Sequence, residues 1–268
     1  MSYLSLPDVE LYFEVHEAVS VSHHPPLLLI AGLASDAQSW QPVIEAARQN
    51  RRVILVDNRG SGRTETHASI SLEQMAQDCI ALVNHLSITA LDVAGHSMGG
   101  FVSLHMARLA SDRIRRLVLC NSSAQAGARN KLMFMDWADA LAQQGATAQW
   151  YRTFFYWIFT RSFFDNQTSV EQMVKLAMSY PYAPNAAAFR SQVEAIQTFD
   201  ATRWLSDIKT PTLVLAASED LIFPPGDDAS QLLGLPHARI KVLPNLAHSL
   251  PMEAPKAFIE EVLRFLDE

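Results

Sequence analysis

Short, strongly apolar runs recur along the chain, and segments with helical periodicity lie between them. The runs are rich in Val, Ile and Leu, and they occupy residues 26–32, 52–58, 91–96, 115–121, 211–218 and 239–244. Brief runs of this kind are typical of parallel strands covered by helices on both faces. The alternation therefore predicts an α/β fold with a mostly parallel, doubly wound sheet. An earlier segment, residues 9–15, alternates apolar and polar side chains and predicts an antiparallel edge strand.

Two of the intervening segments have clear amphipathic helical patterns. Residues 71–86 place apolar side chains at three- and four-residue spacing, with Ser71 as the expected N-cap and Gln74 three positions later. Residues 254–268 repeat the pattern, with Pro255 in the first turn, where proline is tolerated.

The alternation of strands and helices stops between residues 123 and 205. This stretch contains no convincing strand, and nine aromatic side chains crowd into residues 150–164. Strand-like sequence resumes at Pro211. We therefore predict one α/β core, residues 1–122 and 206–268, with a helical cap at 123–205 inserted between two strands.

Charge and composition exclude several classes of function. The formal net charge is −7, and a chain that binds nucleic acid needs clustered Lys and Arg. Cys79 and Cys120 are isolated, which favours buried thiols over a disulfide or a metal site. No secretory leader is recognisable, and no apolar stretch reaches the roughly 18 residues that span a bilayer. We expect a cytoplasmic protein, a monomer or homodimer, without cofactor, metal, nucleic-acid or membrane partner.

Ser97 lies between Gly95 and Gly99, directly after a predicted strand and before a predicted helix. In a sharp strand-to-helix turn, flanking glycines let the neighbouring backbone approach, and the serine hydroxyl stands above the strand ends. An ordinary glycine-rich turn is the alternative. The setting favours a nucleophile, which requires a general base and an acid that orients the base.

His248 is the predicted base, because it follows the last strand and comes late in the chain. In folds of this type the chain order is serine, acid, histidine. The other histidines fall in the N-terminal strand and loop, in surface loops, in helices or beside Ser97; they are His16, His23, His24, His67, His85, His96, His105 and His237.

Asp220 is the predicted orienting acid, since it lies just past a strand between Ser97 and His248. Glu219 is the alternative, although it lies nearer the strand and is longer. Asp207, Asp227 and Asp228 lie in connecting loops, where we expect them to be solvated.

Acyl chemistry also needs two backbone N–H groups facing the oxyanion. The sequence predicts that Met98, after the nucleophile, supplies one. Leu33, in the loop after the first long strand, is the predicted second donor.

These motifs resemble the α/β-hydrolase superfamily, in particular its esterase, enol-lactonase and haloperoxidase-like branch. The residues that carry the resemblance are GHSMGG (95–100), DNRGSGRT (57–64), HSLPMEAP (248–255) and AGLASDAQSW (31–40). The resemblance covers almost the whole chain and implies an eight-stranded sheet and a Ser97–Asp220–His248 triad. Two departures are Ala31, where the family usually has His, and Ala247, where it usually has Gly.

A serine nucleophile indicates hydrolysis of a small-to-medium carboxylic ester or lactone through an acyl-enzyme. Two alternatives remain open: cleavage of a carbon–carbon bond in a diketone from aromatic breakdown, and a non-catalytic small-molecule sensor. Cleavage of a diketone would need a buried side chain that binds a substrate carboxylate, and the candidates in the cap are Arg152, Arg161 and Arg190.

The cap aromatics are expected either to line the pocket over Ser97 or only to pack the cap onto the core. The predicted substrate-binding residues are Trp40, Met133, Trp150, Phe154 and Trp157.

Overall fold

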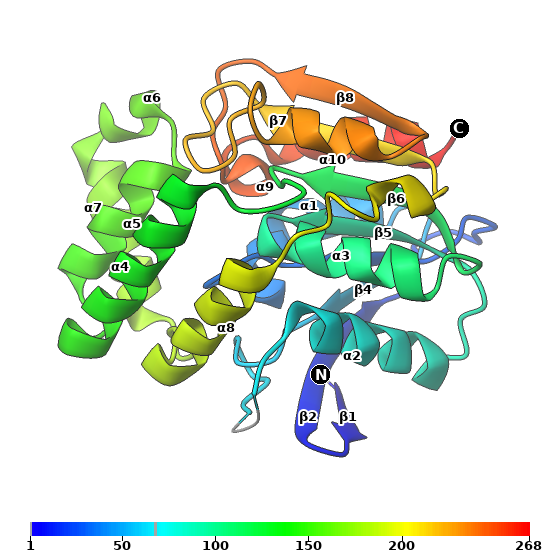
Figure 1. Ribbon diagram of the computed structural model, residues 1–268, viewed down its shortest axis with the longest axis horizontal. Coiled ribbons are helices and arrows are strands. Elements are labelled where there is room, and N and C mark those ends of the chain that lie inside the picture. The colour runs from blue at the N-terminus through cyan, green and yellow to red at the C-terminus, as the bar shows by residue number, and fades with distance from the viewer. Residues whose placement is uncertain (1, 67–68) are drawn as a thin grey trace.

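The predicted parallel sheet is present, and its eight strands lie in the order β1-β2-β4-β3-β5-β6-β7-β8 (Figure 1). The computed structural model describes residues 2–66 and 69–268, so His67, which the sequence places in a surface loop, is outside them. The strands are β1 (Ser2–Leu6), β2 (Val9–His16), β3 (Leu27–Ile30), β4 (Val53–Val56), β5 (Leu91–His96), β6 (Ile114–Cys120), β7 (Thr212–Ala217) and β8 (Ala238–Leu243). From β4 to β8 all neighbours in the sheet pair in parallel.

Two strands differ from what the sequence predicts. β2 is antiparallel, but it is not the edge strand, because β1 pairs with it through a hairpin that turns at Pro7 and Asp8. β1 has few buried side chains, so its sequence carries little apolar signal. β8 is the edge strand at the other end of the sheet, and it is half exposed rather than buried on both faces.

The central strands send alternate side chains into two separate hydrophobic clusters. Leu28 and Ile30 of β3 point to the cluster that contains α2 and α3, whereas Leu27 and Leu29 point to the cluster that contains α1 and α10. Since side chains alternate across a strand, a strand covered on both faces must be apolar throughout. This accounts for the continuous apolar runs in the sequence.

The helices cover both faces of the sheet and form the cap. The α-helices are α1 (Gln41–Ala47), α2 (Leu72–His85), α3 (Met98–Leu109), α4 (Ala128–Gln144), α5 (Ala148–Ile158), α6 (Arg161–Phe164), α7 (Gln167–Ser179), α8 (Ala186–Thr198), α9 (Leu250–Glu253) and α10 (Pro255–Leu266), and the short 3₁₀ helices are η1 (Ala37–Trp40), η2 (Leu205–Asp207) and η3 (Ala229–Gly234). The Ser71 side chain caps α2 by accepting a hydrogen bond from the N–H of Gln74, as predicted.

Helices α4 to α8 all come between β6 and β7 in the chain. Figure 1 shows α4, α5, α6 and α7 grouped beside the sheet, with α8 returning towards α2 and α3. We refer to residues 123–205 as the cap. It stands beyond the carboxyl ends of the parallel strands, where an α/β sheet carries its binding sites.

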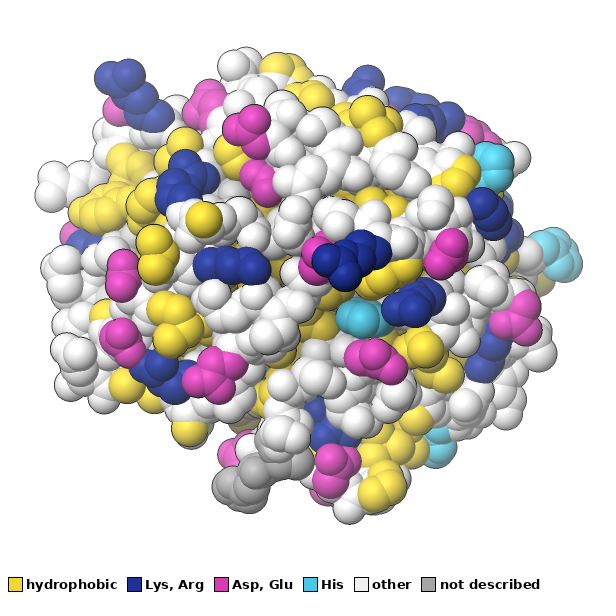
Figure 2. All heavy atoms as spheres, in the orientation of Figure 1, with side chains coloured by type: hydrophobic (Ala, Val, Ile, Leu, Met, Phe, Trp, Pro, Cys, Tyr) yellow, Lys and Arg dark blue, Asp and Glu magenta, His cyan; other side chains and the backbone are white. Residues whose placement is uncertain are grey.

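Charged side chains of both signs are interspersed on the face that Figure 2 shows. Along the described part of the chain, no helix combines the length and the apolarity needed to cross a bilayer.

Candidate active site

Ser97 occupies a strained turn between β5 and α3. Its backbone angles are φ 55° and ψ −120°, a region that costs a non-glycine residue about 1–3 kcal/mol. A Cβ on Gly95 would lie 2.2 Å from the carbonyl oxygen of Gly99, and one on Gly99 would lie 2.1 Å from that of Ile30. Only glycine permits these approaches, so the two glycines allow the sharp turn that lifts Ser97 above the strand end.

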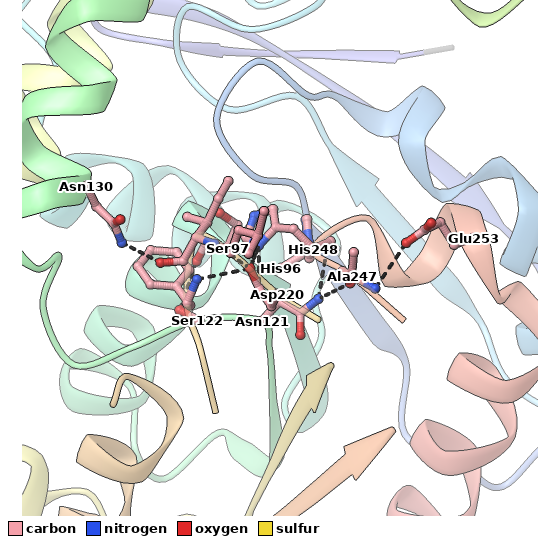
Figure 3. A network of polar contacts seen from close by, with 12 residues as sticks. His96, Ser97, Asn121, Ser122, Asn130, Asp220, Ala247, His248 and Glu253 are labelled. Atoms are coloured by element: carbon pink, nitrogen blue, oxygen red, sulfur yellow. Dashed lines mark hydrogen bonds and ion pairs between the residues drawn. The ribbon is translucent and has the colours of Figure 1, made fainter. Parts of the chain in front are cut away.

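His248 and Asp220 face each other beyond the carboxyl ends of the parallel strands (Figure 3). The His248 Nδ1 lies 2.9 Å and 3.1 Å from the two carboxylate oxygens of Asp220, and both side chains are buried. Asp220 follows β7 and His248 follows β8, whereas Ser97 follows β5. Ser97 and His248 line one cavity. The Ser97 hydroxyl makes no hydrogen bond with the described residues; such contacts often tighten only when substrate binds.

The environment of Asp220 keeps its carboxyl group ionised. Burial raises the pKa of Asp220, but the charge and the hydrogen bond of His248 lower it. The backbone N–H groups of Ile222 and Phe223 also donate to its Oδ1, at 2.8 Å and 3.0 Å. The net result is a pKa below the usual carboxyl value. A carboxylate here fixes the proton of His248 on Nδ1, which leaves Nε2 free to accept one.

The neighbouring acids behave differently from one another. Glu219, the alternative orienting acid, is exposed. Asp228, which the sequence predicts to be solvated, is buried instead, and its carbonyl oxygen accepts a hydrogen bond from the buried Ser123 hydroxyl at 3.3 Å. Burial raises the pKa of Asp228 to about 6, and the charges of Asp220 and Asp227 add to this effect.

Asp228→Asn is expected to stabilise the fold by about 1–3 kcal/mol at pH 7. Because the folded-state pKa of Asp228 is raised, the folded protein favours the neutral carboxyl, and stability is lost as the pH rises from about 4 to above 6. Asparagine carries no charge, so the variant's advantage in the free energy of unfolding should vanish below pH 4, where Asp228 is neutral in both states. Urea unfolding of both proteins at pH 4 and pH 7 measures this, and equal differences at the two pH values would contradict it.

Two backbone N–H groups are available beside Ser97. Within the described residues, neither the N–H of Leu33 nor that of Met98 donates a hydrogen bond to a protein group. Leu33 follows β3 and lines the same cavity as Ser97, and Met98 begins α3. Their free N–H groups suit the oxyanion role that the sequence predicts for both.

The loop that carries Leu33 is held without the histidine that Ala31 replaces. The Asn58 side-chain amide donates to the carbonyl of Ala31 at 2.9 Å, and the Ala37 N–H donates to Asp57 at 2.8 Å. Both supporting side chains belong to the turn after β4 and are buried. This turn therefore supports the loop that carries Leu33.

Residues after β6 hold the backbone of the site, a role that the sequence analysis missed. The Asn121 amide donates to the carbonyl of Ala247 at 3.0 Å and to that of His248 at 2.8 Å. The Ser122 hydroxyl donates to the carbonyl of Ser97 at 2.9 Å. Asn121 has φ 44°, and Asn tolerates this left-handed region better than most residues. An asparagine at a strand end was the available signal.

His96 supports His248 in the same way. Its Nε2 lies 2.8 Å from the carbonyl oxygen of His248, so it must carry the proton and donate. Burial, together with the nearby His248, lowers the pKa of His96 to about 3. His96 is therefore a neutral donor and no competing base.

Glu253 joins the cap to the His248 loop. Its carboxylate accepts from the N–H and the hydroxyl of Thr160, at 2.9 Å and 2.8 Å, and from the N–H of Ala247 at 3.1 Å. The N–H of Ser249 also donates to the carbonyl of Ile158 at 2.8 Å. The end of α5 is thus fixed to the loop on which His248 lies.

The cavity over Ser97 has a volume of about 60 Å³, and we call it the Ser97 cavity. Trp40 and Phe154 line it, but Met133, Trp150 and Trp157 do not. Met133 and Trp157 line a separate groove between α4 and α5. On α5, Phe154 and Ile158 are four residues apart and both line the Ser97 cavity, whereas Trp157 is turned about 60° from Phe154 and about 100° from Ile158. Met133 and Trp157 are therefore not residues of this cavity. Trp150 does not line it either, but it lines a second cavity under the cap.

No group of three or more His, Cys, Asp or Glu side chains among the described residues is arranged to hold a metal ion. The thiols of Cys79 and Cys120 are free and buried, and burial raises the pKa of each.

Comparison with known proteins gives consistent matches over nearly the whole chain. A family model described as the alpha/beta hydrolase fold matches residues 25–255. A curated protein of Azorhizobium caulinodans named "Putative carbamate hydrolase RutD" is 29% identical, with 100% of this chain and 99% of the relative covered. The enol-lactonase of Burkholderia xenovorans LB400 superposes with a TM-score of 0.88 at 25% identity, covering 99% of this chain and 100% of its own. A thermophilic esterase of Thermogutta terrifontis gives 0.82 at 27% identity, covering 99% and 96%.

Proposed function

The chain belongs to the α/β-hydrolase family, and we propose that within it the protein is a serine hydrolase that cleaves a carboxylic ester or lactone. The observation that carries the proposal is the buried Asp220–His248 pair, at 2.9 Å, beside a serine in a strained strand-to-helix turn. This combination turns an unreactive hydroxyl into a nucleophile.

In the proposed reaction, the Ser97 hydroxyl attacks the substrate carbonyl carbon while His248 Nε2 accepts its proton. The oxyanion that forms takes hydrogen bonds from the N–H groups of Leu33 and Met98. The carbon–oxygen bond to the alcohol then breaks, and His248 returns the proton to that oxygen. Water repeats the sequence on the acyl-enzyme, which releases the acid and restores Ser97. Asp220 stays ionised and stabilises the imidazolium throughout.

A carbamate is the second candidate substrate, because curated relatives carry the name carbamate hydrolase. Its carbonyl would meet the same nucleophile and the same N–H donors. Cleavage of a diketone has less support. Arg152 pairs with Glu171, Arg190 pairs with Asp139, and Arg161 is exposed, so none of these arginines anchors a carboxylate at the Ser97 cavity.

Steady-state hydrolysis of a panel of esters, lactones and carbamates, with p-nitrophenyl acetate as reference, tests the proposal. We expect repeated turnover of esters. A single slow turnover, or ligand-induced thermal stabilisation without hydrolysis, would instead indicate the sensor alternative.

A further inference from the structure

A second and larger cavity adjoins the Ser97 cavity under the cap, and we call it the cap chamber. Its volume is about 340 Å³. The two cavities share the side chains of Ser35, Ser39, Phe154, Ile158 and Met252 as lining. These residues therefore form the boundary that anything reaching from one cavity into the other must pass.

The volumes of the two cavities indicate which part of a substrate each of them can hold. Pockets for small organic molecules typically measure roughly 300–1,000 Å³. The Ser97 cavity, at about 60 Å³, accommodates little more than the reacting group. The cap chamber alone reaches the usual size. A substrate of ordinary size with its carbonyl at Ser97 must therefore extend past Phe154 and Ile158 into the chamber.

The two walls of the cap chamber differ in chemistry. The cap supplies an apolar wall from α5, α7 and α8, which includes Tyr151, Phe155 and Phe189. The core supplies a polar edge at Asp36, where the carboxylate accepts a 2.6 Å hydrogen bond from the Tyr180 hydroxyl. No Lys or Arg is among the described residues that line the chamber.

These features restrict what the chamber can bind. Binding is favoured when a hydrocarbon group of the substrate leaves water and is buried against the apolar wall. An anionic group would lose its hydration and face Asp36, and no described side chain that lines the chamber carries a positive charge to replace the water.

We propose that the cap chamber binds an uncharged, extended apolar group of the substrate, an alkyl chain or a ring, while its carbonyl reacts at Ser97. This inference rests on the proposed hydrolase function. It narrows the substrate class to esters with one long or bulky apolar side and excludes those that end in a carboxylate.

Two ester series at fixed enzyme concentration test the assignment. In the acyl series, p-nitrophenyl esters run from acetate to octanoate; in the alcohol series, acetate esters run from ethyl to octyl. In whichever series the varied group enters the chamber, kcat/KM should rise up to about fourfold per methylene, which corresponds to about 0.8 kcal/mol for each buried methylene. The mono-p-nitrophenyl ester of suberic acid, which ends in a carboxylate, should react at least about tenfold more slowly than the octanoate.

A chamber-filling variant gives the second readout. Ala177 on α7 lines the chamber, whereas the adjacent Met178 is exposed and does not. Ala177→Trp should lower the ratio of octyl to short-chain turnover by about tenfold or more, and Met178→Trp, the matched control, should leave that ratio unchanged. Thermal unfolding shows whether Ala177→Trp folds. If it does not, Leu176→Trp replaces it as the chamber-filling variant, because Leu176 lines the chamber and is exposed.

The outcomes are separable. Turnover of esters with no chain-length dependence in either series, or equal ratios in the chamber-filling and control variants, would overturn the chamber assignment alone. Failure to hydrolyse any ester or lactone, p-nitrophenyl acetate included, would overturn the proposed function and the chamber's role with it.

Discussion

Ser97→Ala is expected to lower kcat for p-nitrophenyl acetate by about 10⁵- to 10⁶-fold. The attack of the hydroxyl on the carbonyl is the step on which the proposed acyl-enzyme depends, and alanine offers no atom that can replace it. The fold should be unaffected, because the Ser97 hydroxyl makes no hydrogen bond with another described residue and alanine keeps the same Cβ. Stopped assays over hours, with thermal unfolding of the same sample, measure both effects.

Ser111→Ala is the matched control, since Ser111 is exposed and lies in the turn that follows the C-terminal end of α3. It should retain full turnover. Ester hydrolysis by Ser97→Ala within tenfold of the parent enzyme would show that another group is the nucleophile.

Asp220→Asn is expected to lower kcat by about 10⁴-fold with little change in KM. The asparagine oxygen can keep the N–H groups of Ile222 and Phe223 satisfied. Its amide then points N–H towards His248 Nδ1, which must accept. The imidazole proton moves to Nε2, so His248 no longer accepts the proton of Ser97.

Glu219→Gln separates this effect from a general loss of charge, because Glu219 is adjacent but exposed. Its turnover should equal that of the parent enzyme. Comparable losses in both variants would mean that Asp220 has no special relation to His248.

Much of this architecture is predictable from sequence because it depends on apolar periodicity. The interior strands β3 to β7 are apolar on both faces and therefore visible as runs. The sheet edges are not predicted as well, because β1 is mostly exposed and β8 is apolar on one side only. An edge strand carries less of the apolar signal that reveals the interior strands.

Some residues of the site can be predicted from the sequence and others cannot. Residues that act through a reactive side chain, such as Ser97 and His248, can be proposed from residue type and position. Asn121 and Glu253 act by binding backbone atoms of a loop that is remote in sequence, and residue type alone does not indicate such contacts. Periodicity likewise identifies the faces of α5 without showing that Phe154, and not Trp157, lines the Ser97 cavity.

Covalent labelling with a fluorophosphonate, followed by peptide mass spectrometry, tests the central claim most directly. The reagent phosphonylates a serine only where a base activates it. We expect one label per chain on Ser97, with loss of ester hydrolysis in proportion, and at least about a hundredfold slower labelling in Asp220→Asn. A label on any other residue, or full inhibition with Ser97 unmodified, would contradict the assignment of Ser97, His248 and Asp220 as one catalytic unit.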